Sequence, residues 1–209
     1  MSTPLPSTDP RPVLTVIAGP AGSGKSSLKA DLEQRGEAFD RHIDARTIAD
    51  AIEDEARVAA TRAASVAGEL MRRCLALRQD FSVETDLSED NDLELLRRAK
   101  HLGFETHLYF IATADPSINR ARLEARAEES GDAVPTAKIY TSYWRIMQRL
   151  SEAAWLVNRT TLFDNSEDEA GYQITAECEN GTITLYADPL PDWVNTFFVK
   201  PLAGNAESA

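Results

Sequence analysis

Residues 13–26 read VLTVIAGPAGSGKS, and this stretch decides the fold. An apolar run rich in β-branched residues, typical of a buried strand, leads into a glycine-rich turn that ends in Gly24-Lys25-Ser26. Residues 19–26 fit G-x-x-x-x-G-K-[ST] at each fixed position, between a predicted strand and a predicted helix. The stretch therefore predicts a phosphate-binding loop that holds ATP or GTP.

The residue types of this loop suit phosphate chemistry. Glycines let successive backbone N–H groups turn toward phosphate oxygens, and the following helix adds its N-terminal dipole. A lysine at position 25 reaches the β- and γ-phosphates, and the Ser26 hydroxyl ligates Mg²⁺. ATP and Mg²⁺ are the expected cofactors. The expected nucleotide contacts are Gly19, Pro20, Ala21, Gly22, Ser23, Gly24, Lys25, Ser26 and Ser27.

The rest of the chain alternates between β-rich runs and helical patterns. Strand-like runs at 38–44, 81–86, 105–112 and 161–165 are separated by helical patterns at 47–78, 88–102, 116–129 and 135–157. Short connections favour right-handed crossovers and a parallel sheet, and so an α/β, three-layer P-loop NTPase fold. The arginine-bearing helix at 116–129 is the expected lid. The pattern from 47 to 78 is long for one helix, and Gly68 is a candidate for its break.

Composition predicts a single domain. A chain of 209 residues with 43% hydrophobic content is long enough for one α/β core, expected over 13–200. Residues 1–12 contain four prolines and read as a flexible leader. Asn180-Gly181 between alternating apolar runs predicts a β-hairpin over 172–187, interpreted as an appendage. The small residues of 201–209 predict a disordered tail.

The net charge, the apolar runs and the cysteines indicate which classes of partner and which cellular location to expect. A net charge of −12 argues against a nucleic-acid partner, because phosphate backbones attract lysine and arginine. No apolar run approaches membrane-spanning length, so no membrane partner is expected. Cys74 and Cys178 lie far apart without metal-ligand spacing, which favours free thiols and a cytoplasmic location.

Polar side chains follow the predicted strands where a ligand of an open parallel sheet lies. Asp44 ends the second strand, and Glu84, Thr85 and Asp86 end the third. A carboxylate is needed to accept the proton of an attacking hydroxyl, and arginines to neutralise the transferring phosphoryl group. Each of these residues has a simpler structural alternative. Asp44 would only cap a helix, and Glu84 and Asp86 would face solvent or cap a helix. The arginines of the expected lid would form a solvated helix face.

Beyond these separate features, five strings in order resemble the zeta toxin family, which includes UDP-N-acetylglucosamine kinases. They are GPAGSGKSS, FSVETDLS, AKHLGFETHLYFIA, RARLEARAEESGDAVP and LFDNS, spread over about residues 13–166. The resemblance implies a P-loop kinase that phosphorylates the 3′-hydroxyl of a UDP-amino sugar and is often restrained by a small antitoxin. It places Lys25 and Ser26 at the nucleotide and Mg²⁺, Glu84 and Thr85 at the substrate, and Arg122 and Arg126 in the lid.

The chain departs from the family pattern at three points. The family usually shows Asn/Asp-x-Asp after the second strand, with the second acid as base, and here Arg46 stands at that place. Its Gly-Gly-His is Ser130-Gly131-Asp132 here. Its Arg-Tyr on the next helix is Ser142-Tyr143, with Arg145 one turn away.

The leading hypothesis is an ATP-dependent kinase of a small-molecule hydroxyl. In it Asp44 is the base, Glu84 positions the acceptor with Thr85 and Asp86, and Arg122 or Arg126 stabilises the phosphoryl group. The alternative is a catalytically impaired relative that binds nucleotide as a regulatory or partner-binding module. A third reading is a kinase of another metabolite or nucleotide.

Overall fold

The computed structural model describes residues 11–39, 41–130, 135–167 and 171–206. The parallel strands are β1 (Val13–Ala18), β2 (His42–Asp44), β3 (Phe81–Thr85), β4 (Glu105–Ala112) and β5 (Arg159–Asp164). The helices between them are α1 (Lys25–Gln34), α2 (Ala45–Asp50), α3 (Ala56–Leu77), α4 (Asp90–His101), α5 (Pro116–Ser130) and α6 (Thr136–Leu156). The C-terminal part adds β6 (Gln173–Glu179), β7 (Thr182–Leu185), α7 (Asp192–Val194), the π-helical turn η1 (Asn195–Val199) and α8 (Lys200–Ala206).

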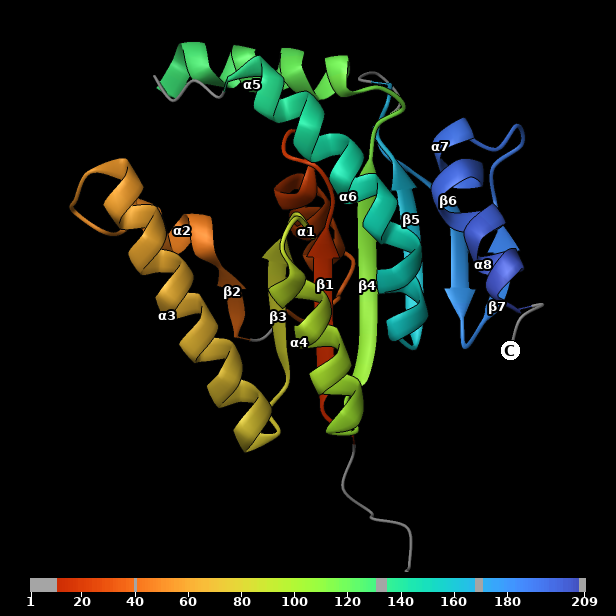
Figure 1. The fold of residues 1–209 in the computed structure, drawn as a ribbon, viewed down its shortest axis with the longest axis horizontal. Coiled ribbons are helices and arrows are strands. Elements are labelled where there is room, and N and C mark those ends of the chain that lie inside the picture. The colour runs from red at the N-terminus through yellow and green to blue at the C-terminus, as the bar shows by residue number, and fades with distance from the viewer. Residues whose placement is uncertain (1–10, 40, 131–134, 168–170, 207–209) are drawn as a thin grey trace, which may run out of the picture.

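Within the described residues the strands form one sheet in the order β2-β3-β1-β4-β5-β6-β7. The first five are parallel, and β6 and β7 are antiparallel additions at one edge. The parallel strands all point toward α5, which lies beyond their arrowheads in Figure 1. This arrangement confirms the predicted P-loop kinase fold with a mostly parallel sheet, a helix over its C-terminal edge and a hairpin after it.

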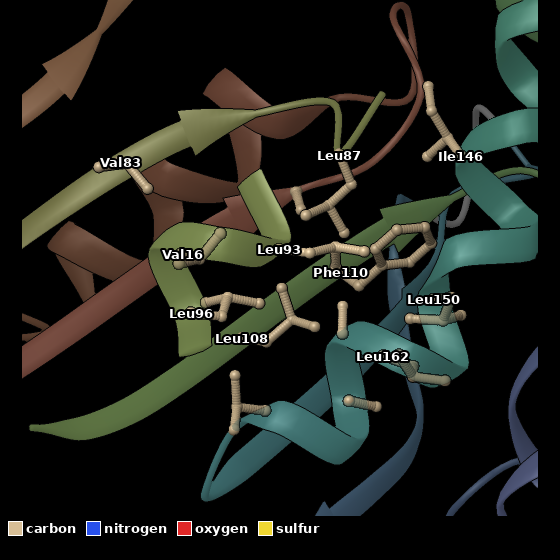
Figure 2. Close-up of a cluster of buried hydrophobic side chains, with 14 of the residues drawn as sticks. Val16, Val83, Leu87, Leu93, Leu96, Leu108, Phe110, Ile146, Leu150 and Leu162 are labelled. Carbon is tan, nitrogen blue, oxygen red and sulfur yellow. The ribbon is translucent and has the colours of Figure 1, made fainter. Parts of the chain in front are cut away.

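Helices cover both faces of the sheet. The larger core lies between the sheet and α3, α4 and α6, where alternate residues of each strand point the same way. Figure 2 shows Leu96 of α4 and Leu150 of α6 over Leu108 and Phe110 of β4. A smaller core on the opposite face packs α1 against the sheet through residues such as Ile17 and Leu28. Burial on both faces explains why the parallel strands read as nearly continuous apolar runs.

The helical pattern of 47–78 does break, but not at Gly68. Residues 51–55 separate α2 from α3, and Gly68 lies inside α3. Added to Gly68, a Cβ would meet only the end of the Arg72 side chain, at 3.6 Å, so this glycine marks no bend or close backbone approach. Within the described residues, every helix is too short or too polar to cross a bilayer.

The C-terminal region packs into the larger core, whereas its sequence predicted an appended hairpin and a disordered tail. The hairpin is present with Asn180-Gly181 at its turn, and β6 pairs with β5 along its length. The tail expected to be disordered from residue 201 instead forms α8 over residues 200–206, where Leu202 is 4% exposed and joins the larger core. Residues 207–209, and residues 1–10 of the expected leader, lie outside the described residues.

One buried hydrogen bond ties α6 to the end of β4, next to the start of α5. The Tyr143 hydroxyl donates to the Thr113 carbonyl oxygen at 2.5 Å, and the ring is 1% exposed. We expect Tyr143→Phe to lower the free energy of unfolding by about 1–3 kcal/mol, because the carbonyl loses a partner in a site closed to water. Urea denaturation measures this change in the free energy of unfolding. Tyr186→Phe is the matched control, since that hydroxyl donates to Glu177 from an exposed ring. An equal loss of unfolding free energy in the two variants would show that the buried Tyr143–Thr113 hydrogen bond contributes no more than an exposed one.

Candidate active site

A cavity of about 450 Å³ opens at the C-terminal edge of the parallel strands and is lined in part by α5. Its walls come from four places that are far apart in the sequence. The phosphate loop and the start of α1 contribute Ala21, Gly22, Gly24, Lys25, Ser26 and Ser27. The ends of β2 and β3 contribute Asp44, Ala45, Arg46, Glu84, Thr85 and Asp86, and α5 contributes Arg122 and Arg126.

The Lys25 side chain curls back over the loop that precedes it. Its ammonium donates to the carbonyl oxygens of Gly19 at 2.9 Å and Pro20 at 3.4 Å. Burial lowers the pKa of Lys25, whereas the carboxylates of Glu84 and Asp86 act in the opposite direction. The lysine therefore holds a half-buried cation at the mouth of the loop, where the phosphates of a nucleotide bind in proteins with this motif.

Two asparagines that the sequence analysis did not single out hold the loop in shape. Asn165 follows β5, and its side-chain amide donates to the Ser23 carbonyl at 2.8 Å. Asn119 of α5 is fully buried, and its amide donates to the Ala21 carbonyl at 2.8 Å. Asn165 lies within the string LFDNS, which carried the family resemblance without a role for this residue. Nothing in the sequence distinguished Asn119 from a surface helix residue.

The same two asparagines explain two glycines of the loop. A Cβ on Gly22, where φ is +79°, would lie 2.8 Å from the Asn119 carbonyl oxygen. A Cβ on Gly24, where φ is +103°, would lie 2.6 Å from the Asn165 amide nitrogen. These positions need glycine both for the left-handed backbone and for the close approach of the clamping residues.

Ser26 and Glu84 meet in the wall of the cavity. The Ser26 hydroxyl donates to Oε2 of Glu84 at 3.3 Å. Burial raises the pKa of Glu84, and the nearby Lys25 ammonium partly offsets this by favouring the carboxylate. The pair therefore joins the first turn of α1 to the end of β3 beside the phosphate loop.

The Ser26–Glu84 pair also fits a magnesium ion bound with a nucleotide. Within the described chain no three His, Cys, Asp or Glu side chains form a metal-binding group. Mg²⁺ in phosphoryl-transfer sites is held by phosphate oxygens, waters and only one or two side chains. A hydroxyl and a carboxylate 3.3 Å apart beside the loop meet that requirement.

Asp44 caps a helix and lines the cavity at once. Its oxygens accept the backbone N–H groups of Arg46 at 2.9 Å and Thr47 at 3.3 Å, and the Thr47 hydroxyl at 2.7 Å. The register of the sheet pairs Asp44 with Glu84, so the two carboxylates end neighbouring strands side by side. The capping alternative is therefore correct for Asp44, and it does not remove the residue from the cavity.

The other predicted acceptor residues are also partly engaged. The Thr85 hydroxyl donates to Oδ1 of Asp92 on α4 at 2.8 Å and accepts the Leu87 N–H at 3.1 Å. Oδ1 of Asp86 accepts the Ser88 N–H at 3.0 Å. These bonds fix the turn after β3, so Thr85 and Asp86 face the cavity from a rigid backbone.

Arginines face the strand ends from α5 and α2. Arg122 and Arg126 of α5 line the cavity, as expected for lid arginines, whereas Arg120 makes an ion pair with Glu124 at 3.7 Å outside it. The pKa of Arg126 is lowered by burial and by the Arg46 guanidinium, while Glu84 opposes the shift. Arg46 thus lies within electrostatic reach of both the lid and the β3 carboxylate.

Most of the predicted site comes together around this one cavity. Of the predicted loop contacts, Gly19, Pro20 and Ser23 do not line it; the first two bind the Lys25 ammonium and Ser23 is fully buried. Tyr143 packs in the core, and Arg145 of the same helix lies outside the cavity lining. Gly131 and Asp132, from the second departure, lie outside the described residues.

The zeta toxin family model matches residues 2–177 of this chain. The chain belongs to the zeta toxin family. The P-loop kinase fold described above agrees with this membership. The comparison with curated proteins gave no match.

Solved structures share the fold at low sequence identity. A chain of the AvrRxo1-ORF1:-ORF2 complex with ATP superposes with a TM-score of 0.67 at 14% identity, covering 86% of this chain and 62% of that one. A chain of the PezAT toxin-antitoxin system of Streptococcus pneumoniae gives 0.66 at 16%, covering 97% and 87%. A putative kinase from Chloroflexus aurantiacus gives 0.50 at 14%, covering 65% and 76%. This chain thus spans less than two thirds of the AvrRxo1 chain.

The asparagine clamp gives a test of the loop geometry. We expect Asn165→Ala to weaken ATP binding by about tenfold, because losing one hydrogen bond frees the Ser23 carbonyl and relaxes the loop. Calorimetry with ATP and Mg²⁺ measures the affinity. Asn91→Ala, on the exposed face of α4, is the control and should bind as the wild type does. Wild-type affinity in Asn165→Ala would show that the loop keeps its shape without this contact.

Proposed function

We propose that this protein transfers the γ-phosphoryl group of ATP to a hydroxyl of a small molecule. The observation that carries the proposal is the single cavity in which a phosphate loop, two adjacent strand-end carboxylates and two lid arginines meet. The resemblance described in the sequence analysis implies the 3′-hydroxyl of a UDP-amino sugar as the acceptor. The AvrRxo1 complex, which shares the fold, was solved with ATP.

In this proposal each named group has a stated task, and Glu84 has two. The loop N–H groups and Lys25 bind the β- and γ-phosphates of ATP. Ser26 and Glu84 would hold Mg²⁺, and the ion would neutralise part of the phosphate charge. Arg122 and Arg126 stabilise the charge on the transferring phosphoryl group from above.

The acceptor binds at the ends of β2 and β3. Glu84, Thr85 and Asp86 orient it, and Asp44 takes the proton from its attacking hydroxyl. Asp44 suits this task because three hydrogen bonds from α2 fix its carboxylate at the cavity wall. A fixed carboxylate needs no reorientation before proton transfer.

A protein partner is part of the same proposal. The PezAT structure is of a toxin-antitoxin system, which supports a small antitoxin as a partner of this chain. Both described cysteines are buried free thiols, consistent with the proposed cytoplasmic location.

The competing function is a nucleotide-binding module without transfer activity. Arg46 favours it, because a guanidinium stands in the cavity wall where the family pattern has its base, and arginine does not release its proton in proteins. The two functions share ATP binding and differ in phosphoryl transfer.

The nucleotide site is tested with Lys25→Ala. Removing this cation should lower phosphoryl transfer by about 10²–10³-fold and weaken ATP binding, since a preorganised charge at the phosphates is lost. Calorimetry and transfer from labelled ATP to a panel of UDP-sugars measure the two effects. Lys29→Ala is a control, because Lys29 pairs with Glu33 one turn further along α1 and lies outside the cavity lining. If Lys25→Ala binds and transfers as well as the wild type, the nucleotide site lies elsewhere.

The base is tested with Asp44→Asn. Asparagine caps a helix about as well as aspartate, so this substitution removes proton acceptance while keeping α2 in place. We expect ATP affinity to remain and phosphoryl transfer to fall by about 10²–10⁴-fold. Single-turnover transfer to the best acceptor measures the step.

Asp86→Asn is run beside it, because Asp86 is a further carboxylate facing the acceptor and, unlike Glu84, has no proposed role at the metal ion. Undiminished transfer in Asp44→Asn with a loss in Asp86→Asn would move the base to Asp86. ATP binding by the wild type without transfer to any acceptor would favour the module.

A further inference from the structure

The turn after β3 begins at Thr85, in the cavity wall, and is anchored in the larger core. Leu87 and Leu93 are buried, and Figure 2 shows both in the cluster that contains Phe110 of β4. Leu87 has a φ of +59°, a left-handed backbone conformation that costs free energy in a residue with a bulky side chain. Tertiary packing therefore sets the turn, and Thr85 faces the cavity from a backbone with little freedom.

Asp92 of α4 lies outside the cavity lining but controls the hydrogen bonds of the Thr85 hydroxyl. Its Oδ1 accepts the hydroxyl proton of Thr85 at 2.8 Å, and its Oδ2 accepts the Glu89 N–H at 3.2 Å. Burial raises the pKa of Asp92, whereas these two hydrogen bonds act to lower it because they favour the carboxylate. An ionised Asp92 can only accept, so the hydroxyl proton of Thr85 points toward α4.

The hydrogen-bonding capacity of the Thr85 hydroxyl is therefore nearly used up. A hydroxyl has one proton to donate and two lone pairs that accept. In Thr85 the proton goes to Asp92, and one lone pair accepts the Leu87 N–H at 3.1 Å. One lone pair remains for a ligand in the cavity, so Thr85 can accept a hydrogen bond from that ligand and cannot donate one.

We propose that Asp92 is a positioning residue that makes Thr85 solely a hydrogen-bond acceptor toward the substrate. The substrate then presents a hydroxyl or N–H group at Thr85, and a group that has only lone pairs is disfavoured there because the two oxygens would repel. Asp92 itself contacts neither the substrate nor ATP. The inference rests on the proposed kinase function and concerns specificity within it.

The test measures steady-state transfer by the full chain from ATP with Mg²⁺ to UDP-N-acetylglucosamine, or to the UDP-sugar of the panel that is phosphorylated fastest. Asp92→Asn keeps the size of the side chain. Asparagine accepts the Glu89 N–H with its amide oxygen only if its NH₂ group faces Thr85, which turns the hydroxyl proton away from α4. We expect KM for the UDP-sugar to rise by about three- to tenfold, the scale of one neutral hydrogen bond, while kcat and KM for ATP change by less than about twofold.

A double-mutant cycle separates positioning from a structural role. Thr85→Val removes the hydroxyl and keeps the shape of the side chain, so KM for the UDP-sugar should again rise. Adding Asp92→Asn to Thr85→Val should raise KM no further, because the group through which Asp92 acts is gone. Glu89→Gln is the matched control. It removes the same charge from the same end of α4, outside the cavity lining, and should leave KM and kcat at wild-type values.

Three results would overturn the inference alone: Asp92→Asn leaves KM for the UDP-sugar unchanged, it weakens ATP binding to the same degree, or the two substitutions raise KM independently. The second result would assign Asp92 a structural role. Absence of transfer by the wild type to every UDP-sugar would instead refute the proposed function and the inference with it. The wild type alone shows this result, so the two failures are distinguishable.

Discussion

The phosphate loop keeps its shape because two asparagine side chains hold its carbonyl groups from outside. Asn165 binds the Ser23 carbonyl, and Asn119 binds the Ala21 carbonyl. A loop whose N–H groups must turn inward toward phosphate leaves its carbonyl groups pointing outward, where they need donors of their own. These donors come from the end of β5 and from α5, so the loop depends on the sheet and the lid together.

The same dependence links the loop to the rest of the fold. Asp164, next to Asn165, accepts the Trp193 indole N–H at 2.5 Å, and Trp193 is buried in the larger core. The C-terminal helices therefore support the strand end from which one clamp of the loop extends. The hairpin supports the same strand, because β6 pairs with β5 and its Ala176 and Cys178 side chains are buried.

Charges in the cavity are ordered along the strand ends. Lys25 stands at β1, the carboxylates of Asp44, Glu84 and Asp86 stand at β2 and β3, and arginines approach from α5 and α2. Parallel strands bring their C-terminal ends to one edge, so residues 40 positions apart, such as Asp44 and Glu84, become direct neighbours. A site of mixed charge can then bind a polyphosphate and a hydroxyl acceptor side by side.

The sequence by itself determined the local features whose cause lies within a few residues. The strand–loop–helix of 13–34, the strand of 105–112 and the Asn-Gly turn at 180–181 are all present, because apolar periodicity and glycine or asparagine geometry act over short range. It also identified the strand-end residues that line the cavity. Tertiary structure decided the features that depend on distant partners. It gives Asn119 and Asn165 their hydrogen bonds to the loop, and it lets Asp44 cap α2 and line the cavity together with Arg46. It also makes residues 201–206 helical. Each is a contact between segments separated along the chain, and neither composition nor periodicity encodes such a contact.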